Sequence, residues 1–81
     1  MDSDTTILFD TSAINEKVVH DTIVSVYESL EERGYNAINQ IVGYIISGDL
    51  GYISSYKEAR NKMSKLDRNN IVEVLLRTYL K

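Results

Sequence analysis

Apolar residues recur along this chain at steps of three and four, the spacing that places side chains on one face of an α-helix. Four such stripes run between residues 15 and 80, separated by short polar or glycine-containing stretches. The pattern predicts four short helices whose apolar faces pack together as a compact all-α bundle. The stripe residues are Val19, Ile23, Val26, Tyr27 and Leu30; Ile38, Ile41, Val42 and Ile45; Tyr56, Ala59, Met63 and Leu66; and Ile71, Val74, Leu75 and Thr78.

The ends of the predicted helices rest on residues with known positional preferences. Asn15, Asn36 and Asp67 each precede a stripe, and their side chains can accept a hydrogen bond from the free N–H groups of a first helical turn. Gly34 and Gly48 follow the first two stripes, where the left-handed backbone at a helix end favours glycine. We therefore expect each of these five residues to mark a helix boundary.

Two local patterns predict how the middle of the chain is built. Asp49 is suited to capping a short turn, and Ser55 with Glu58 forms the Ser-x-x-Glu capping box expected at the start of the third helix. Gly43 lies inside the second helix, where glycine costs about 1 kcal/mol relative to alanine. We expect that cost to be offset by the close approach of another backbone at Gly43.

Residues 1–14 differ in composition from the rest of the chain. Asp, Ser and Thr dominate there, around one apolar island, Ile7-Leu8-Phe9. Small polar residues at a terminus are typical of flexible chain. The sequence thus predicts a flexible N-terminal tail over residues 1–14 and a single helical domain over residues 15–81.

The composition excludes certain kinds of site and predicts how the chain assembles. The 81 residues include no cysteine, which excludes disulfides and thiolate metal sites, and the longest apolar run, Tyr44-Ile45-Ile46, is too short for a membrane span or a signal peptide. A domain of this size buries only about 60–65% of its extended surface, so we expect a homodimer. Candidate interface positions are those smaller or more apolar than a lone core needs: Gly43, Tyr44 and Tyr79.

No residue pattern indicates catalysis, a metal or a cofactor. His20 and Asp21 are adjacent, and neighbours on a helix point about 100° apart, so we expect an exposed histidine that does not meet the aspartate. Glu28, Glu31 and Glu32 share one helix face, but they sit near the negative helix end and are expected to be solvated. We therefore expect no catalytic residue, no metal site and no cofactor.

Charge is divided unevenly along the chain. Residues 1–34 carry eight acidic and two basic side chains, a net charge of −6, whereas residues 35–81 carry four acidic and seven basic ones, a net charge of +3. The third predicted helix shows a basic face, formed by Lys57, Arg60, Lys62 and Lys65, with Arg68 following. This face is either solvated or, as an alternative, the surface of a small nucleic-acid-binding module, although the pI of about 5.0 argues against nucleic acid.

One long stretch carries a family resemblance. Residues 34–44, GYNAINQIVGY, followed by Ser47-Gly48-Asp49, Tyr52-Ile53 and Ala59-Arg60-Asn61, resemble the IreB family of small bacterial regulatory phosphoproteins. The likeness extends from about Thr6 to Leu80. The chain departs from the family at Ala37 and at Leu50-Gly51, where proline is common; proline is tolerated but not required at a first helical position.

The resemblance implies a cytoplasmic, dimeric, non-enzymatic regulator of Gram-positive bacteria. It implies phosphorylation by a membrane-anchored Ser/Thr kinase with extracellular PASTA repeats, reversal by a cognate phosphatase, and a role in cell-envelope stress and cephalosporin tolerance. The main acceptor of the family corresponds to Thr6, directly before the apolar island. The second corresponds to Ser3, with Thr5 as a neighbouring substitute.

These inferences combine into one leading hypothesis, a homodimeric regulatory phosphoprotein with an unknown downstream protein partner. Phosphorylated Thr6 is expected to dock on basic side chains such as Lys57, Arg60 or Arg68 through charge-assisted hydrogen bonds. Two alternatives stay open at this point: the nucleic-acid-binding module, and a structural adaptor whose phosphorylation has no consequence.

Overall fold

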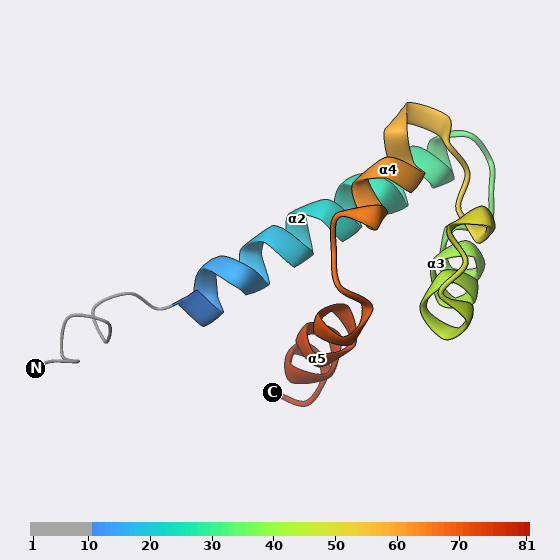
Figure 1. The fold of residues 1–81 in the computed structure, drawn as a ribbon. Coiled ribbons are helices and arrows are strands. Elements are labelled where there is room, and N and C mark those ends of the chain that lie inside the picture. The colour runs from blue at the N-terminus through green and yellow to red at the C-terminus, as the bar shows by residue number, and fades with distance from the viewer. Residues whose placement is uncertain (1–10) are drawn as a thin grey trace, which may run out of the picture.

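The computed structural model describes residues 11–81, which fold into helices joined by short connections (Figure 1). Helix α2 spans Thr11–Glu32, α3 spans Ala37–Ser47, α4 spans Ala59–Ser64 and α5 spans Arg68–Tyr79, with 3-10 turns η1 at Leu50–Tyr52 and η2 at Tyr56–Glu58. This part of the chain contains four α-helices and no strand, as the apolar spacing predicts.

Helix α2 is the long axis on which the other helices pack. Figure 1 shows α4 beside the C-terminal half of α2, while α3 and α5 lie below α2 in that view. The core is formed by eleven buried apolar residues: Val19, Val26, Leu30, Ala37, Ile41, Tyr44, Ile53, Ala59, Met63, Ile71 and Val74. Within residues 11–81, no helix has both the length and the apolar character needed to cross a membrane.

Helix boundaries set by local chemistry are confirmed at five positions. Gly34 and Gly48 follow α2 and α3 with φ of 85° and 77°, the left-handed backbone that glycine adopts without strain. The side chains of Asn36, Asp49 and Asp67 accept backbone N–H groups at 3.0, 2.8 and 3.1 Å. They begin α3, η1 and α5, respectively.

The expected cap at Asn15 is wrong. Helix α2 begins at Thr11, so residues 11–14, assigned above to the tail, are helical and Asn15 lies inside the helix. Its amide instead exchanges two hydrogen bonds with the amide of Asn70 in α5, at 2.9 and 2.7 Å. The reason is tertiary: a partner 55 residues away satisfies the side chain that would otherwise cap a helix.

The expected capping box at Ser55 is also wrong. The Ser55 side chain makes no capping hydrogen bond, and α4 begins only at Ala59, after two left-handed residues, Lys57 and Glu58, with φ of 51° and 65°. Ile53 and Ala59 are both fully buried. The chain between them must turn tightly to bring both side chains into the core, and this turn takes the place of the first helical turn.

Two packing expectations need correction. A Cβ placed on Gly43 would lie 2.6 Å from Cδ1 of Tyr52, so an aromatic ring, rather than a second backbone, occupies the space beside the glycine. Ile38 belongs to a predicted buried stripe but is 60% exposed, and Thr78 is exposed as well. Helix α3 therefore presents apolar side chains on two faces, of which the protomer buries one.

Candidate functional site

The predicted phospho-acceptors Ser3, Thr5 and Thr6 lie outside the described residues. The structure does give the position at which the chain that carries them joins the fold. The chain enters α2 at Thr11, five residues after Thr6. A fully extended chain spans about 3.3–3.6 Å per residue, which places Thr6 no more than about 18 Å from Thr11. This reach decides which side chains of its own chain the tail can meet.

The basic side chains proposed to hold a phosphate are all engaged within the protomer. Lys57 Nζ lies 2.8 Å from Glu32 Oε1 on the surface, and the Glu32 hydrogen bond, with the charges of Glu32 and Tyr56, raises the pKa of Lys57 above its usual value. Arg60 Nε donates to the Ile53 carbonyl at 2.8 Å.

Arg68 lies at the start of α5, where its Nη1 donates to the Ile45 carbonyl at 2.9 Å. Its guanidinium also occupies the space beside Gly48, since a Cβ on that glycine would lie 2.8 Å from Cζ. Arg68 is two residues from Asn70, which bonds Asn15 near the start of α2. Of the three candidate residues, Arg68 is the one placed near the entry point of the tail.

Lys57 is beyond the reach of its own Thr6. Its partner Glu32 lies 21 residues after Thr11 on α2, a separation of about 32 Å at 1.5 Å per residue. The tail from Thr11 to Thr6 covers about 18 Å at most. Phosphorylated Thr6 can therefore meet Lys57 only on a second chain, and the three basic residues do not form one cluster.

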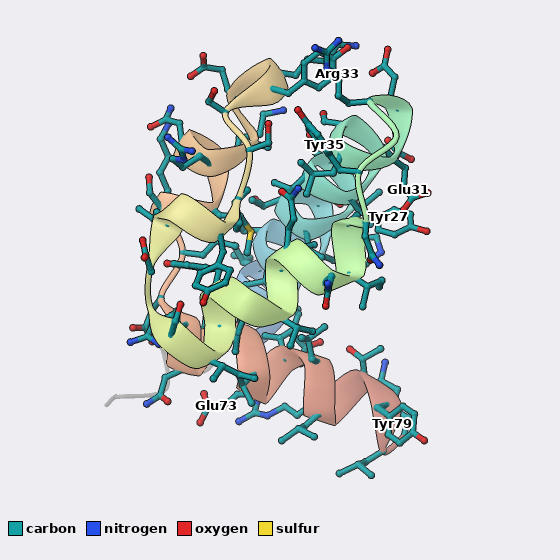
Figure 2. All side chains as sticks on the ribbon, turned by 90° about the vertical axis from the view of Figure 1, so that its right-hand side faces the viewer. Tyr27, Glu31, Arg33, Tyr35, Glu73 and Tyr79 are labelled. Carbon is teal, nitrogen blue, oxygen red and sulfur yellow. The ribbon has the colours of Figure 1, made fainter. Side chains whose placement is uncertain are left out.

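The aromatic ring of Tyr56 organises the basic side chains at this end. The Arg33 guanidinium lies 5.4 Å from the ring centroid and the Lys57 ammonium 5.7 Å from it, a geometry in which the ring face attracts both cations. Figure 2 shows Arg33 and Tyr35 together at the top of the molecule. Hydrogen bonds from Arg33 first, and then Ser54, lower the pKa of the Tyr35 hydroxyl.

The geometry does not favour the nucleic-acid alternative. Helix α4 is only six residues long, and Lys57, left-handed in its backbone, is not part of it. Lys62 Nζ donates to Ser25 Oγ of α2 at 2.7 Å, so this lysine is directed toward the protein. A continuous basic helix of the kind that enters a groove of DNA is absent from residues 11–81.

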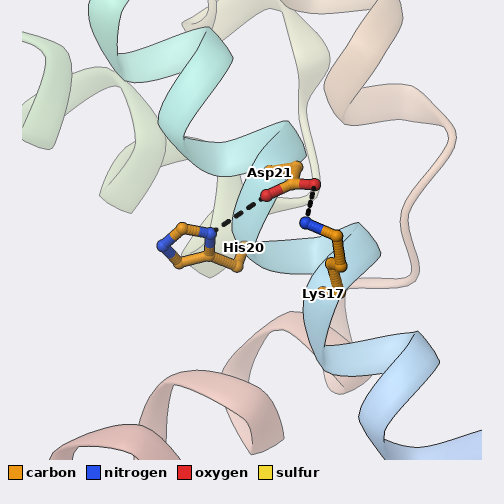
Figure 3. Close-up of polar contacts among 3 residues, drawn as sticks. All are labelled: Lys17, His20 and Asp21. Carbon is orange, nitrogen blue, oxygen red and sulfur yellow. Dashed lines mark hydrogen bonds and ion pairs between the residues drawn. The ribbon is translucent and has the colours of Figure 1, made fainter.

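His20 and Asp21 do meet, contrary to the expectation from helix geometry. His20 Nδ1 lies 3.2 Å from one carboxylate oxygen of Asp21, and Lys17 Nζ lies 3.0 Å from the other. Figure 3 shows both contacts. The Lys17 hydrogen bond, and after it the His20 one, lowers the pKa of Asp21 below its usual value. The histidine is exposed, as expected, and it contacts a solvated surface ion pair formed by Lys17 and Asp21.

The three acidic residues Glu28, Glu31 and Glu32 are exposed, as predicted. Glu32 is paired with Lys57. Across the described part of the chain, no three His, Cys, Asp or Glu side chains come together in a way that could hold a metal ion.

The three residues proposed for the dimer interface differ in how far the structure buries them. Tyr44 is buried in the core, whereas Gly43 is partly buried beside the Tyr52 ring. Tyr79 is 85% exposed near the end of α5. Figure 2 shows Tyr79 and Tyr27 projecting on the same side of the molecule.

An apolar surface that the sequence did not single out lies between α2, α3 and α5. It consists of two adjoining hollows, named the near groove and the far groove by their distance from Thr11, where α2 begins. The two grooves share Ile23, Val24 and Leu75. The far groove, of about 270 Å³, has no charged lining residue; it is lined by Ile23, Val24, Tyr27, Ile38, Ile41, Val42, Ile45 and Leu75. The near groove, of about 700 Å³, lies between the first half of α2 and the C-terminal half of α5.

A signal for this surface was present in α3. The segment AINQIVGYIIS has apolar residues around most of its circumference, which is typical of a helix covered on more than one side. Contiguous exposed apolar surface of this kind marks interaction sites in soluble proteins.

Residues 4–81 match one family model, that of the IreB regulatory phosphoprotein. The match covers all of the described residues and part of the N-terminal tail. The chain belongs to the IreB family. The family is one of regulatory phosphoproteins, which assigns the chain a regulatory role. The matched range includes Thr5 and Thr6 and begins one residue after Ser3.

Proposed function

We propose that this IreB-family protein is a non-enzymatic cytoplasmic regulator that is switched by phosphorylation of Thr6. The kinase is a transmembrane PASTA-type Ser/Thr kinase, a cognate phosphatase reverses the reaction, and the output is the cell-envelope stress response and cephalosporin tolerance. The observation that supports this function is the family match, which covers residues 4–81 and so includes Thr6. Thr5 and Ser3 are secondary acceptors, with Ser3 the weaker because it precedes the matched range.

The far groove supports a homodimer as the working unit. Five of its lining residues, Val24, Tyr27, Ile38, Val42 and Leu75, are between 37% and 60% exposed although they are apolar. Stable interfaces bury about 800 Å² per partner and have apolar centres. An uncharged groove of this kind suits an isologous contact, in which the same surface of each chain meets its copy.

The phosphate-docking hypothesis takes a specific form in such a dimer. Because Thr6 cannot reach Lys57 of its own chain, a phosphate held by Lys57 and the neighbouring Arg60 would have to come from the partner chain. Arg60 keeps Nη1 and Nη2 for such a contact, since its bond to Ile53 uses Nε. Docking of this kind would tie the phosphorylation state to the dimer.

The kinase assay tests the acceptor. The protein is incubated with a PASTA-type kinase and ATP, and the phosphosites are mapped by mass spectrometry in the native chain and in Thr6→Ala, Thr5→Ala and Ser3→Ala variants. We expect Thr6→Ala to remove most of the label and the other two to leave most of it. Undiminished labelling of the Thr6→Ala/Ser3→Ala double variant would place the switch elsewhere.

Light scattering tests the dimer separately. The native chain should give twice the mass of one chain, and Ile38→Asp in the far groove should give the mass of a monomer. Ile46→Asp is the matched control, because Ile46 is on the same helix and is 78% exposed but does not line the groove. A monomeric native protein, or equal effects of both substitutions, would contradict this interface.

A further inference from the structure

The near groove begins where the described chain begins. Its lining starts at Ala13, two residues into α2, and continues along α2 to Val24 and along α5 from Val74 to Lys81. Tyr79 lines it while remaining largely exposed. Residues 1–10 therefore join the fold at the mouth of an apolar hollow.

The tail carries an apolar segment at the matching distance. From Thr11, an extended chain reaches about 7 Å to Phe9 and about 14 Å to Ile7. Along α2, Glu16 lies about 7.5 Å and His20 about 13.5 Å from Thr11. The island Ile7-Leu8-Phe9, folded back beside α2, thus spans the stretch of helix that lines the near groove.

The same arithmetic excludes the far groove as the destination of the island. Tyr27 lies about 24 Å along α2 from Thr11, well beyond the reach of Ile7. The two hollows therefore suit different occupants: a second chain for the far groove and the tail of the same chain for the near groove.

The charges around the near groove suit an apolar occupant. Its lining holds two acids, Glu16 and Asp21, and two bases, Lys17 and Lys81, so the fixed charges balance. Lys17 is already paired with Asp21. The groove thus lacks the net positive charge that would select a phosphate or an acidic peptide.

We propose that Ile7-Leu8-Phe9 docks in the near groove of its own chain, and that phosphorylation of Thr6 releases it. The second half of this statement rests on the proposed function. A phosphate on Thr6 adds a charge of about −1.5 to −2 next to the docked island. In the lining, Glu16 and Asp21 repel that phosphate and Lys17 is already paired with Asp21, which leaves Lys81 to offset the added charge, so the docked state is disfavoured.

A spin label tests the docking directly. The chain contains no cysteine, so Asp2→Cys gives a single attachment point for a nitroxide at the start of the tail. In ¹H–¹⁵N spectra of the unphosphorylated full chain, we expect the label to broaden the amides of residues 13–20 and 78–81. Adding Leu8→Ser/Phe9→Ser to the labelled chain should abolish the broadening.

A mixed sample distinguishes docking of a chain's own tail from docking of the tail of a second chain. In a sample of spin-labelled unenriched chain and unlabelled ¹⁵N chain, own-chain docking predicts sharp signals at residues 13–20 and 78–81 of the enriched chain. Broadening of these signals in the mixed sample, or unchanged broadening in the labelled chain on adding Leu8→Ser/Phe9→Ser, would overturn the proposal. The first of these results would assign the near groove to the tail of a second copy.

Phosphorylation is then tested on the same labelled chain. The sample is phosphorylated to completion with a PASTA-type kinase, or carries Thr6→Glu as a substitute, and the broadening at residues 13–20 and 78–81 should be lost. Persistent broadening in the phosphorylated chain would overturn the release. Failure of the kinase to modify Thr6 would contradict the proposed function alone, because docking of the unmodified tail is measured without the kinase.

Discussion

The paired amides of Asn15 and Asn70 give the sharpest test of how the fold positions the near groove. They join the second turn of α2 to the first turn of α5 through two hydrogen bonds of 2.9 and 2.7 Å between half-buried side chains. Beside this pair, α5 contributes the buried side chains of Ile71 and Val74 to the core. Removing either amide therefore loses both bonds at once.

The expected loss of stability in Asn15→Ala follows from the two hydrogen bonds between the amides. Each contributes about 0.5–1.5 kcal/mol net, so Asn15→Ala loses about 1–3 kcal/mol. Alanine returns up to about 0.7 kcal/mol through its better helix propensity, which leaves a net loss of at least roughly 0.3–2.3 kcal/mol. For a domain of this size, that corresponds to a fall in the melting temperature of about 4–8 °C per kcal/mol.

A double-mutant cycle isolates the pair. The free energy of unfolding is measured by urea denaturation for the native chain, Asn15→Ala, Asn70→Ala and the double variant, with exposed Asn61→Ala as the control. Because each single change breaks the same two bonds, the double variant should lose little more than either single, a coupling of about 1–3 kcal/mol. Additive losses would refute the reasoning and show that the amides do not depend on each other.

Three further predictions concern single positions. Gly48→Ala should lower the free energy of unfolding by about 1 kcal/mol or more, because φ is 77° and the new Cβ would meet the Arg68 guanidinium; an unchanged urea midpoint would contradict this. The lowered pKa of Asp21 stabilises the fold above the usual aspartate pKa, and this contribution is lost as the pH falls through the lowered value. Asp21→Asn should therefore flatten the acid limb of stability against pH, and an identical acid limb would contradict it. Lys57→Gln should leave the urea midpoint nearly unchanged, since its ion pair is half exposed; a clear fall in the midpoint would show that the pair acts within a network.

Local chemistry made part of the fold predictable. Asn36, Asp67, Gly34 and Gly48 act through hydrogen bonds or backbone angles within a few residues, and their roles follow from sequence alone. The role of Asn15 does not, since it is decided by a partner in another helix.

Contacts between distant segments explain the other misses. Ser55 matches a capping box, but the burial of Ile53 and Ala59 on either side of it imposes a tight turn instead. The stripe of α3 was predicted without showing which half the protomer covers, and so Ile38 was expected in the core. The apolar surface between α2, α3 and α5 emerged only when the three helices were assembled.

The residues of the candidate site were only partly predictable from the sequence. The proposal of Thr6 as the acceptor rests on the family resemblance, since no pattern of charge or hydrophobicity distinguishes Thr6 from Thr5. The docking residues Lys57, Arg60 and Arg68 are close in sequence, yet the structure separates Arg68 from Lys57 along the length of α2. The sequence did not indicate this separation, which arises because the chain runs back along α2 from Glu32, the partner of Lys57, past Ser25, the partner of Lys62, to Asn15, the partner of Asn70.

The central claim, that phosphorylation of Thr6 is the regulatory switch, is tested most directly in cells by the cephalosporin tolerance of a strain whose chromosomal copy carries Thr6→Ala. The account predicts that tolerance changes relative to the native strain and that Ser3→Ala leaves it nearly unchanged. Native tolerance in strains carrying Thr6→Ala, Thr6→Glu and the Thr6→Ala/Ser3→Ala double variant, with the protein at native abundance, would contradict the claim.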